Sequence, residues 1–236
     1  MEFADIMDQK HLNDPAWKAR KGALFFLVAL WLLIFLPAGS LGYWQGWLLW
    51  SHFTAWTAGG TWYFLKYDPA LVQRRLRAGP MAERDPAQKR IQLVVAIAVV
   101  ALFLVSALDY RYGWSAVPWP VVVASNLLFA IGYLFICVVL RENSFASSTI
   151  EVAPDQKVIA TGPYALMRHP MYAGALVMFL AVPPALGSWW GLAPFAVLTA
   201  GVLQRLKNEE AYLVRSLPGY DIYRSRVRSR LIPGLW

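Results

Sequence analysis

Six stretches of apolar sequence constrain this chain more than any other feature. A helix that crosses a bilayer needs about 20 mostly apolar residues, and the candidate spans are 22–38, 44–65, 91–108, 119–140, 170–186 and 189–206. The whole chain of 236 residues is 58% hydrophobic and 15% charged, whereas a soluble domain carries about 25% charged residues. The sequence therefore predicts an all-α integral membrane protein with about six transmembrane helices.

The positive charges predict how these spans are oriented. Basic residues are enriched in cytoplasmic loops, and every Lys and Arg except Arg111 lies before the first span, after the second, after the fourth, or at and beyond the end of the sixth. Both termini are therefore expected in the cytoplasm. The net charge of +8 is then explained by anionic lipid headgroups rather than by nucleic acid. The excess of Arg over Lys and the compact chain suggest a prokaryotic plasma membrane.

Two smaller expectations concern the first spans. A polar lead and an immediate second span favour an uncleaved anchor over a signal peptide for residues 22–38. Ser51, Ala55 and Gly59 recur every four residues in the second span, a pattern typical of close packing between membrane helices. The loop 67–90 is expected to hold a short interfacial helix.

The polar segment after the fourth span is the most informative part of the chain. It carries several charges and is longer than an ordinary helix connection of about 2–8 residues, so we divide the chain into four N-terminal spans (1–140) and a C-terminal region (141–236). Pro170 suits the first position of a helix. Arg168 and His169 are therefore expected beside a helix N-terminus, which attracts anions.

Spans five and six form a helical hairpin, which brings distant residues to the same cytoplasmic end. His169 and Tyr172 at the start of span five should lie near Arg205, Glu209 and Glu210 at the end of span six. Taken singly, His169 could cap a helix and the two carboxylates could be solvated charges. Taken together they favour a functional site. The one Cys and three His do not form a metal-binding set.

Four motifs in this region resemble the isoprenylcysteine carboxyl methyltransferase family. They read G-P-Y-A-L-M-R-H-P-M-Y-A-G, R-L-K-N-E-E-A-Y-L, G-Y-D-I-Y and R-L-I-P, and they fall within 141–236. Membrane methyltransferases that modify phospholipid amines share part of the pattern, and some membrane sterol reductases have a similar terminal region. Residues 1–110 resemble no specific family.

The resemblance implies a cytoplasmic pocket for S-adenosylmethionine at the end of the terminal hairpin. The cofactor contacts that it implies are Gln156, Lys157, Val158, Ile159, Tyr164, His169, Pro170, Met171, Tyr172 and Glu209. It also implies that Arg205 lies at the substrate, and it makes Asn143 a further substrate contact. Arg205, His169 and Glu210 are the candidate catalytic residues.

The chemistry of these residue types is compatible with methyl transfer to a lipophilic acceptor. Tyrosine rings can face a sulfonium cation, and Arg205 could orient an acceptor carboxylate. An amine acceptor would need a base, for which His169 and Glu210 are candidates. An NADPH-dependent reductase of membrane isoprenoids or sterols and a non-enzymatic transporter or scaffold are the alternatives. Membrane lipids and a lipophilic or lipidated substrate are the expected partners, and no obligate protein partner is evident.

Overall fold

The computed structural model describes residues 14–76, 78–83, 85–153 and 155–236, and this part of the chain is helical without strands. The long helices are α2 (Pro15–Ala38), α3 (Trp44–Tyr67), α5 (Pro86–Tyr112), α6 (Trp119–Glu142), α7 (Pro170–Ala185) and α8 (Leu192–Ser216). The short ones are α4 (Pro69–Arg75), α9 (Tyr220–Arg226) and the 3₁₀ turns η1 (Pro80–Ala82) and η2 (Gly162–Ala165). Each predicted span therefore coincides with a long helix, and the loop 67–90 contains the expected short helix.

Local capping explains where several helices begin. Asp14 accepts a hydrogen bond from the amide of Ala16 and precedes Pro15, so α2 starts well before the apolar stretch. Asp85 and Pro86 begin α5 in the same way. The helix α7 ends at Ala185, with Pro183 and Pro184 in its last turn.

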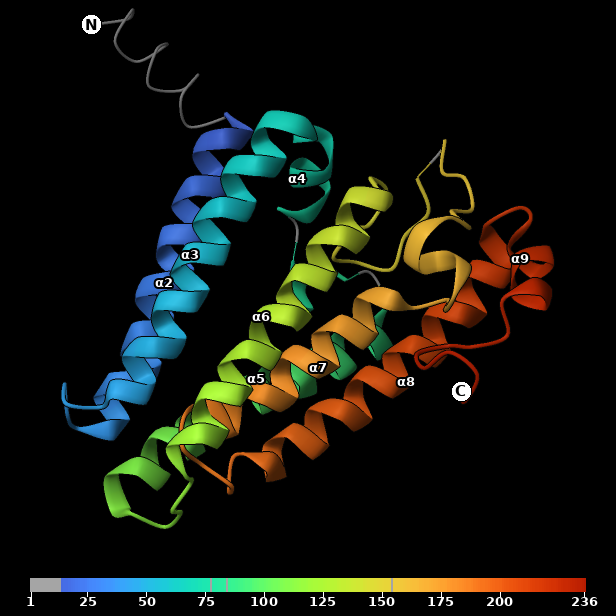
Figure 1. Cartoon of the computed structure of the whole chain (residues 1–236). Coiled ribbons are helices and arrows are strands. Elements are labelled where there is room, and N and C mark those ends of the chain that lie inside the picture. Colours follow the sequence, from blue (N-terminus) through green and yellow to red (C-terminus); the bar gives the residue numbers. More distant parts are fainter. Residues whose placement is uncertain (1–13, 77, 84, 154) are drawn as a thin grey trace, which may run out of the picture.

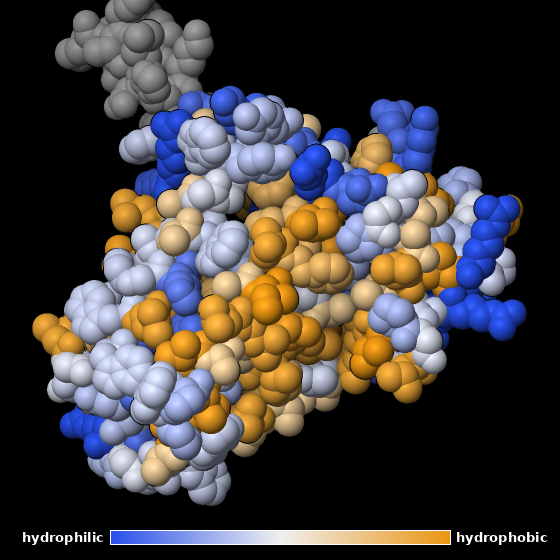
Figure 2. All heavy atoms as spheres, in the orientation of Figure 1, coloured by the Kyte–Doolittle hydropathy of each residue, from blue (hydrophilic) through white to orange (hydrophobic). Residues whose placement is uncertain are grey.

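Three helices in the described part of the chain are long and apolar enough to cross a membrane by length and composition, namely α2, α5 and α6. The helix α7 is apolar but shorter. Large apolar side chains such as Phe25 and Ile131 are 75% and 62% exposed, and Figure 2 shows a broad hydrophobic surface with charged residues toward the ends of the molecule. A surface of this kind is consistent with an integral membrane protein. The predicted cytoplasmic charges Lys10, Arg77 and Arg84 lie outside the described residues.

The closest helix contact lies between α6 and α7. A Cβ atom added to Gly132 would come within 2.8 Å of the backbone nitrogen of Met178, and one added to Gly174 within 2.9 Å of the Ile136 side chain. The predicted packing face of α3 is different, because Ser51, Ala55 and Gly59 are exposed. Nothing lies within 4 Å of a Cβ at Gly59. The prediction that these small residues pack against another helix was therefore wrong for this chain.

A buried carboxylate fixes the turn of the α7–α8 hairpin. Asp109 of α5 is 1% exposed and accepts hydrogen bonds from the Ser115 amide and hydroxyl and from the Ser188 hydroxyl. The end of α6, the start of α7, α4 and α9 all lie toward the opposite end of the molecule (Figure 1). The predicted site residues lie at that end.

Candidate functional site

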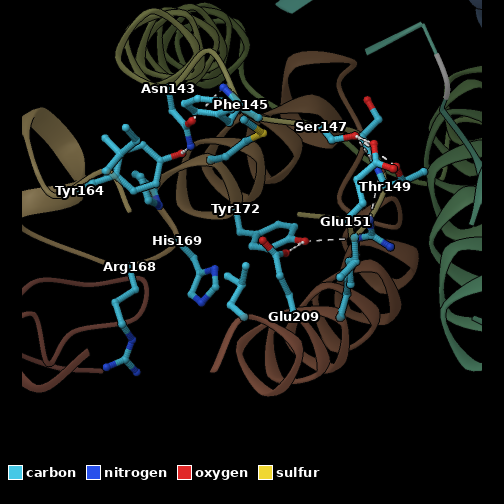
Figure 3. A pocket seen from close by; sticks show the side chains of 18 of the residues that line it. Asn143, Phe145, Ser147, Thr149, Glu151, Tyr164, Arg168, His169, Tyr172 and Glu209 are labelled. Carbon is cyan, nitrogen blue, oxygen red and sulfur yellow. Dashed lines mark hydrogen bonds between the residues drawn. The ribbon is translucent and has the colours of Figure 1, made fainter. Parts of the chain in front are cut away.

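A cavity of about 330 Å³ opens between the end of α6, the start of α7, the middle of α8 and the segment 143–165. Every cofactor and substrate contact implied by the family resemblance lines it: Asn143, Gln156, Lys157, Val158, Ile159, Tyr164, His169, Pro170, Met171, Tyr172, Arg205 and Glu209. Figure 3 shows Asn143, Tyr164, His169, Tyr172 and Glu209 around the same space. Glu210 is not among the lining residues.

The C-terminal tail holds the start of α7 in place. The amides of Arg168 and His169 donate hydrogen bonds to the carbonyls of Ser229 and Arg230, at 3.0 and 2.9 Å. Because Pro170 lacks an N–H and occupies the first turn, the helix begins here without losing a hydrogen bond. The His169 imidazole is buried at the cavity wall.

Glu210 binds the tail and the α7 entrance together. Its carboxylate lies 2.6 Å from Nε of Arg168, 2.9 Å from Nε of Arg230 and 3.3 Å from Nε2 of His169. Burial raises the pKa of Glu210, but interactions with His169, Arg230 and Arg168 outweigh burial and lower the pKa to about 2. An ionised carboxylate that is engaged by three basic groups is suited to holding structure rather than to removing a proton from an acceptor.

A hydrogen-bonded chain reaches the cavity from α8. The Tyr172 hydroxyl donates to Oε2 of Glu209 at 2.5 Å and accepts from Nε of Arg205 at 3.1 Å. Figure 3 shows the contact between Tyr172 and Glu209 at the centre of the site. Arg205 thereby orients the phenol, and the phenol orients the carboxylate that faces the cavity.

Three further donors of Arg205 contact other groups of the protein. Its Nη2 lies 2.7 Å from Oε1 of Glu83 and 3.1 Å from the carbonyl of Ser148, while Nη1 lies 3.5 Å from Oε1 of Gln88. Arg205 is 6% exposed and Glu83 is 3% exposed. Glu83 was not predicted from the sequence, since nothing local marks one acidic residue in an Arg-rich loop as the partner of a distant helix.

The loop 67–90 also shapes the segment that follows α6. Asp68 accepts a hydrogen bond from the Ser144 hydroxyl, and Arg74 donates to the Ser144 carbonyl and stacks on the ring of Phe145. The Ile150 amide donates to Oε2 of Glu83 at 3.3 Å. The cavity therefore depends on residues from both 1–140 and 141–236.

Two polar contacts organise the rest of the lining. The amide of Asn143 donates to the Tyr164 hydroxyl at 3.0 Å, and burial raises the pKa of Tyr164 to about 12. The Gln156 side chain accepts from the Ala153 amide at 3.0 Å, which turns the chain before the extended residues 157–159. The phenol and amide at this wall are neutral, so they provide hydrogen bonds without charge.

Comparisons with known proteins agree with the C-terminal motifs. Residues 120–218 match the model of the phospholipid methyltransferase family. The protein-S-isoprenylcysteine O-methyltransferase of Schizosaccharomyces pombe is 36% identical over 77 residues, which is 32% of this chain and 33% of that protein. The similarity thus spans about one third of the length of the curated relative. The expected resemblance is confirmed, and residues 120–218, which match the phospholipid methyltransferase family, supply most of the cavity wall.

Proposed function

We propose that this protein is a membrane methyltransferase that uses S-adenosylmethionine and modifies a lipophilic acceptor, most simply a carboxylate of the isoprenylcysteine type. The observation that carries the proposal is the convergence of the implied cofactor contacts on one cavity. These contacts come from residues 156–159, from Tyr164, from the start of α7 and from Glu209 of α8. They are distant in sequence, yet they line a single space.

The cavity has the chemistry that such a donor requires. A volume of about 330 Å³ lies within the range of small-molecule sites. Glu209 offers a carboxylate to ribose hydroxyls or to an amine, and Tyr164 and Tyr172 offer ring faces to adenine or to a cation. When bound, the donor would supply an electrophilic methyl group on a sulfonium.

The protein's own part in the reaction is chiefly positioning. The chain from Arg205 through Tyr172 to Glu209 holds the polar groups in one geometry, and the apolar side chains of Phe179, Leu198 and Val202 exclude water from the inner wall. A carboxylate acceptor needs no proton removed, whereas an amine acceptor does. Because Nε2 of His169 faces Glu210 at 3.3 Å, the buried imidazole is better placed to support the wall than to act as a free base.

The membrane arrangement belongs to the same proposal. Six spans with both termini in the cytoplasm would put the cavity at the cytoplasmic surface, where a water-soluble donor can reach it. The one-sided distribution of Lys and Arg supports this orientation. The exposed apolar belt of α2, α5 and α6 supports insertion.

Binding of the demethylated product S-adenosylhomocysteine tests the proposal. Calorimetry on the purified protein in detergent should show saturable binding, and Glu209→Gln should weaken it by about tenfold, since a hydrogen bond to a charged group contributes roughly 1.5–3 kcal/mol. Asp221→Asn is the matched control, because Asp221 is exposed and outside the cavity. Folded wild-type protein that fails to bind the product would exclude this function.

A further inference from the structure

The arginines that line the cavity differ in what neutralises them. Arg205 lies against Glu83, and Arg168 lies against Glu210. Arg75, the last residue of α4, also lines the cavity. Its Nη1 lies 3.7 Å from Sδ of Met171, and no carboxylate of the described residues forms an ion pair with it.

The surroundings of Arg75 are poor in compensating charge. Burial lowers the pKa of Arg75, and the neighbours that act against this shift are the phenols of Tyr164 and Tyr133. Arg75 is half-buried, and a cation that is partly withdrawn from water without an anion carries a desolvation cost. An anionic ligand in the cavity would offset that cost, so the position is suited to binding one.

A second, apolar groove lies on another part of the molecule's surface. It lies between α3 and α6, has a volume of about 480 Å³ and is lined by Ala55, Trp56, Gly59, Gly60, Tyr63, Phe64, Leu134, Cys137, Val138 and Arg141. Tyr63, Cys137 and Met171 pack around the same buried cluster. Met171 lines the cavity while Tyr63 and Cys137 line the groove, so Arg75, against Met171, lies close to where the two spaces meet.

We infer that Arg75 binds the anionic group of the methyl acceptor, while the acceptor's hydrocarbon chain lies in the groove between α3 and α6. This inference rests on the proposed methyltransferase function and names its substrate class, a lipid whose acidic group reaches Arg75. It also reassigns the role that the sequence suggested for Arg205. Arg205 is already neutralised by Glu83 and bonded to Tyr172, so we assign it the role of orienting Tyr172 in the cavity wall.

The anion could be the carboxylate of an isoprenylcysteine or the phosphate of a phospholipid, and two probes distinguish these sources. The first is S-farnesyl-N-acetylcysteine, compared with its uncharged carboxamide, and the second is phosphatidylethanolamine in nanodiscs. Binding of each is measured on wild type, Arg75→Gln, Arg75→Lys and Lys66→Gln. Lys66 lies at the end of α3 outside the cavity, against Trp62 and Tyr67, and controls for the loss of one positive charge.

We expect Arg75→Gln to weaken binding of the acidic farnesyl probe by at least about tenfold, because a charged hydrogen bond is removed. Binding of the carboxamide should be unchanged. Arg75→Lys should restore part of the affinity, and Lys66→Gln should match wild type. If Arg75→Gln lost binding of phosphatidylethanolamine but kept binding of the farnesyl probe, the anion would be phosphate. Unchanged binding of both probes would overturn the inference.

S-adenosylhomocysteine binding separates the acceptor from the donor. Arg75→Gln should bind it within about twofold of wild type, and a tenfold loss would mean that Arg75 holds the donor's own carboxylate, which overturns the inference. Wild type that binds the acidic probe through Arg75 but not S-adenosylhomocysteine would retain an anionic-lipid site and remove the methyltransferase proposal.

A groove-filling substitution tests where the hydrocarbon chain lies. Gly59→Leu places a side chain where a Cβ meets nothing within 4 Å, and Gly22→Leu on α2 is equally unobstructed and lies outside the groove. Gly59→Leu should weaken binding of the farnesyl probe several-fold, whereas Gly22→Leu should leave its binding unchanged. Equal binding by both variants would overturn the groove assignment.

Discussion

Two walls of the cavity use arginine in opposite ways. On the α8 wall, Arg205 is buried together with Glu83 and orients Tyr172 and Glu209. On the α4 wall, Arg75 faces a thioether and phenols. The same guanidinium group is a structural element where a carboxylate is buried with it and a candidate ligand-binding group where none is. The residue type alone therefore does not determine the role.

A third arginine that lines the cavity, Arg168, extends the comparison. Arg168 is 8% exposed and shares Glu210 with Arg230, so the tail, the α7 entrance and α8 are held at one point. Disturbing each paired arginine should reduce stability, whereas disturbing Arg75 should change binding. Stability measurements on variants of Glu210 and Glu83 test the structural role of the paired arginines.

The largest effect is expected for Glu210→Ala. It leaves Arg168 buried without its partner, and removing one member of a buried ion pair costs about 3–5 kcal/mol. Chemical denaturation in detergent, followed by tryptophan fluorescence, measures the loss. Asp221→Asn breaks only the exposed pair with Arg224 at 3.7 Å and should cost less than about 1 kcal/mol. Equal stability of the two variants would contradict a structural role for Glu210.

A smaller effect, about 2–3 kcal/mol, is expected for Glu83→Gln, because the one acceptor oxygen of glutamine keeps the contact with either Arg205 or the Ile150 amide while the charge is lost. A double-mutant cycle with Arg205→Met measures the coupling. The double variant should lose less stability than the sum of the single variants. Strictly additive losses would show that Glu83 does not neutralise Arg205.

The smallest effect is the pH dependence conferred by Glu210. Its pKa falls from the ordinary value of 4.5 to about 2 in the folded protein, so its contribution is complete above about pH 5 and is lost as pH falls toward 2. The stability difference between wild type and Glu210→Gln should shrink by about 1–2 kcal/mol between pH 5 and pH 3. A stability difference that stays constant between pH 5 and pH 3 would contradict a lowered pKa for Glu210.

Much of the architecture follows from local sequence patterns. Each predicted apolar stretch lies in a long helix, and α7 begins at Pro170, as the dipeptide His169-Pro170 predicted. The helix α8 ends at Ser216, which lies beyond the predicted apolar stretch. Its last turns are stabilised by packing against α9 and the tail, which the local sequence does not show. The small residues of α3 show the opposite error, since their spacing predicts packing but no helix in the described part of the chain covers them.

The sequence by itself predicted the helical membrane class, the hairpin and, through the motifs, part of the set of residues that line the cavity, because hydropathy, helix-start signals and motif spacing are read along a single stretch of chain. It did not single out Arg75. Only the tertiary structure decided which charges are paired. Glu83 meets Arg205, Glu210 meets Arg168 and Arg230, and Arg75 meets none of the described carboxylates. Ion pairing depends on distances of a few ångströms between segments that are remote in sequence, and these distances are set by how α4, α5, α7 and α8 pack.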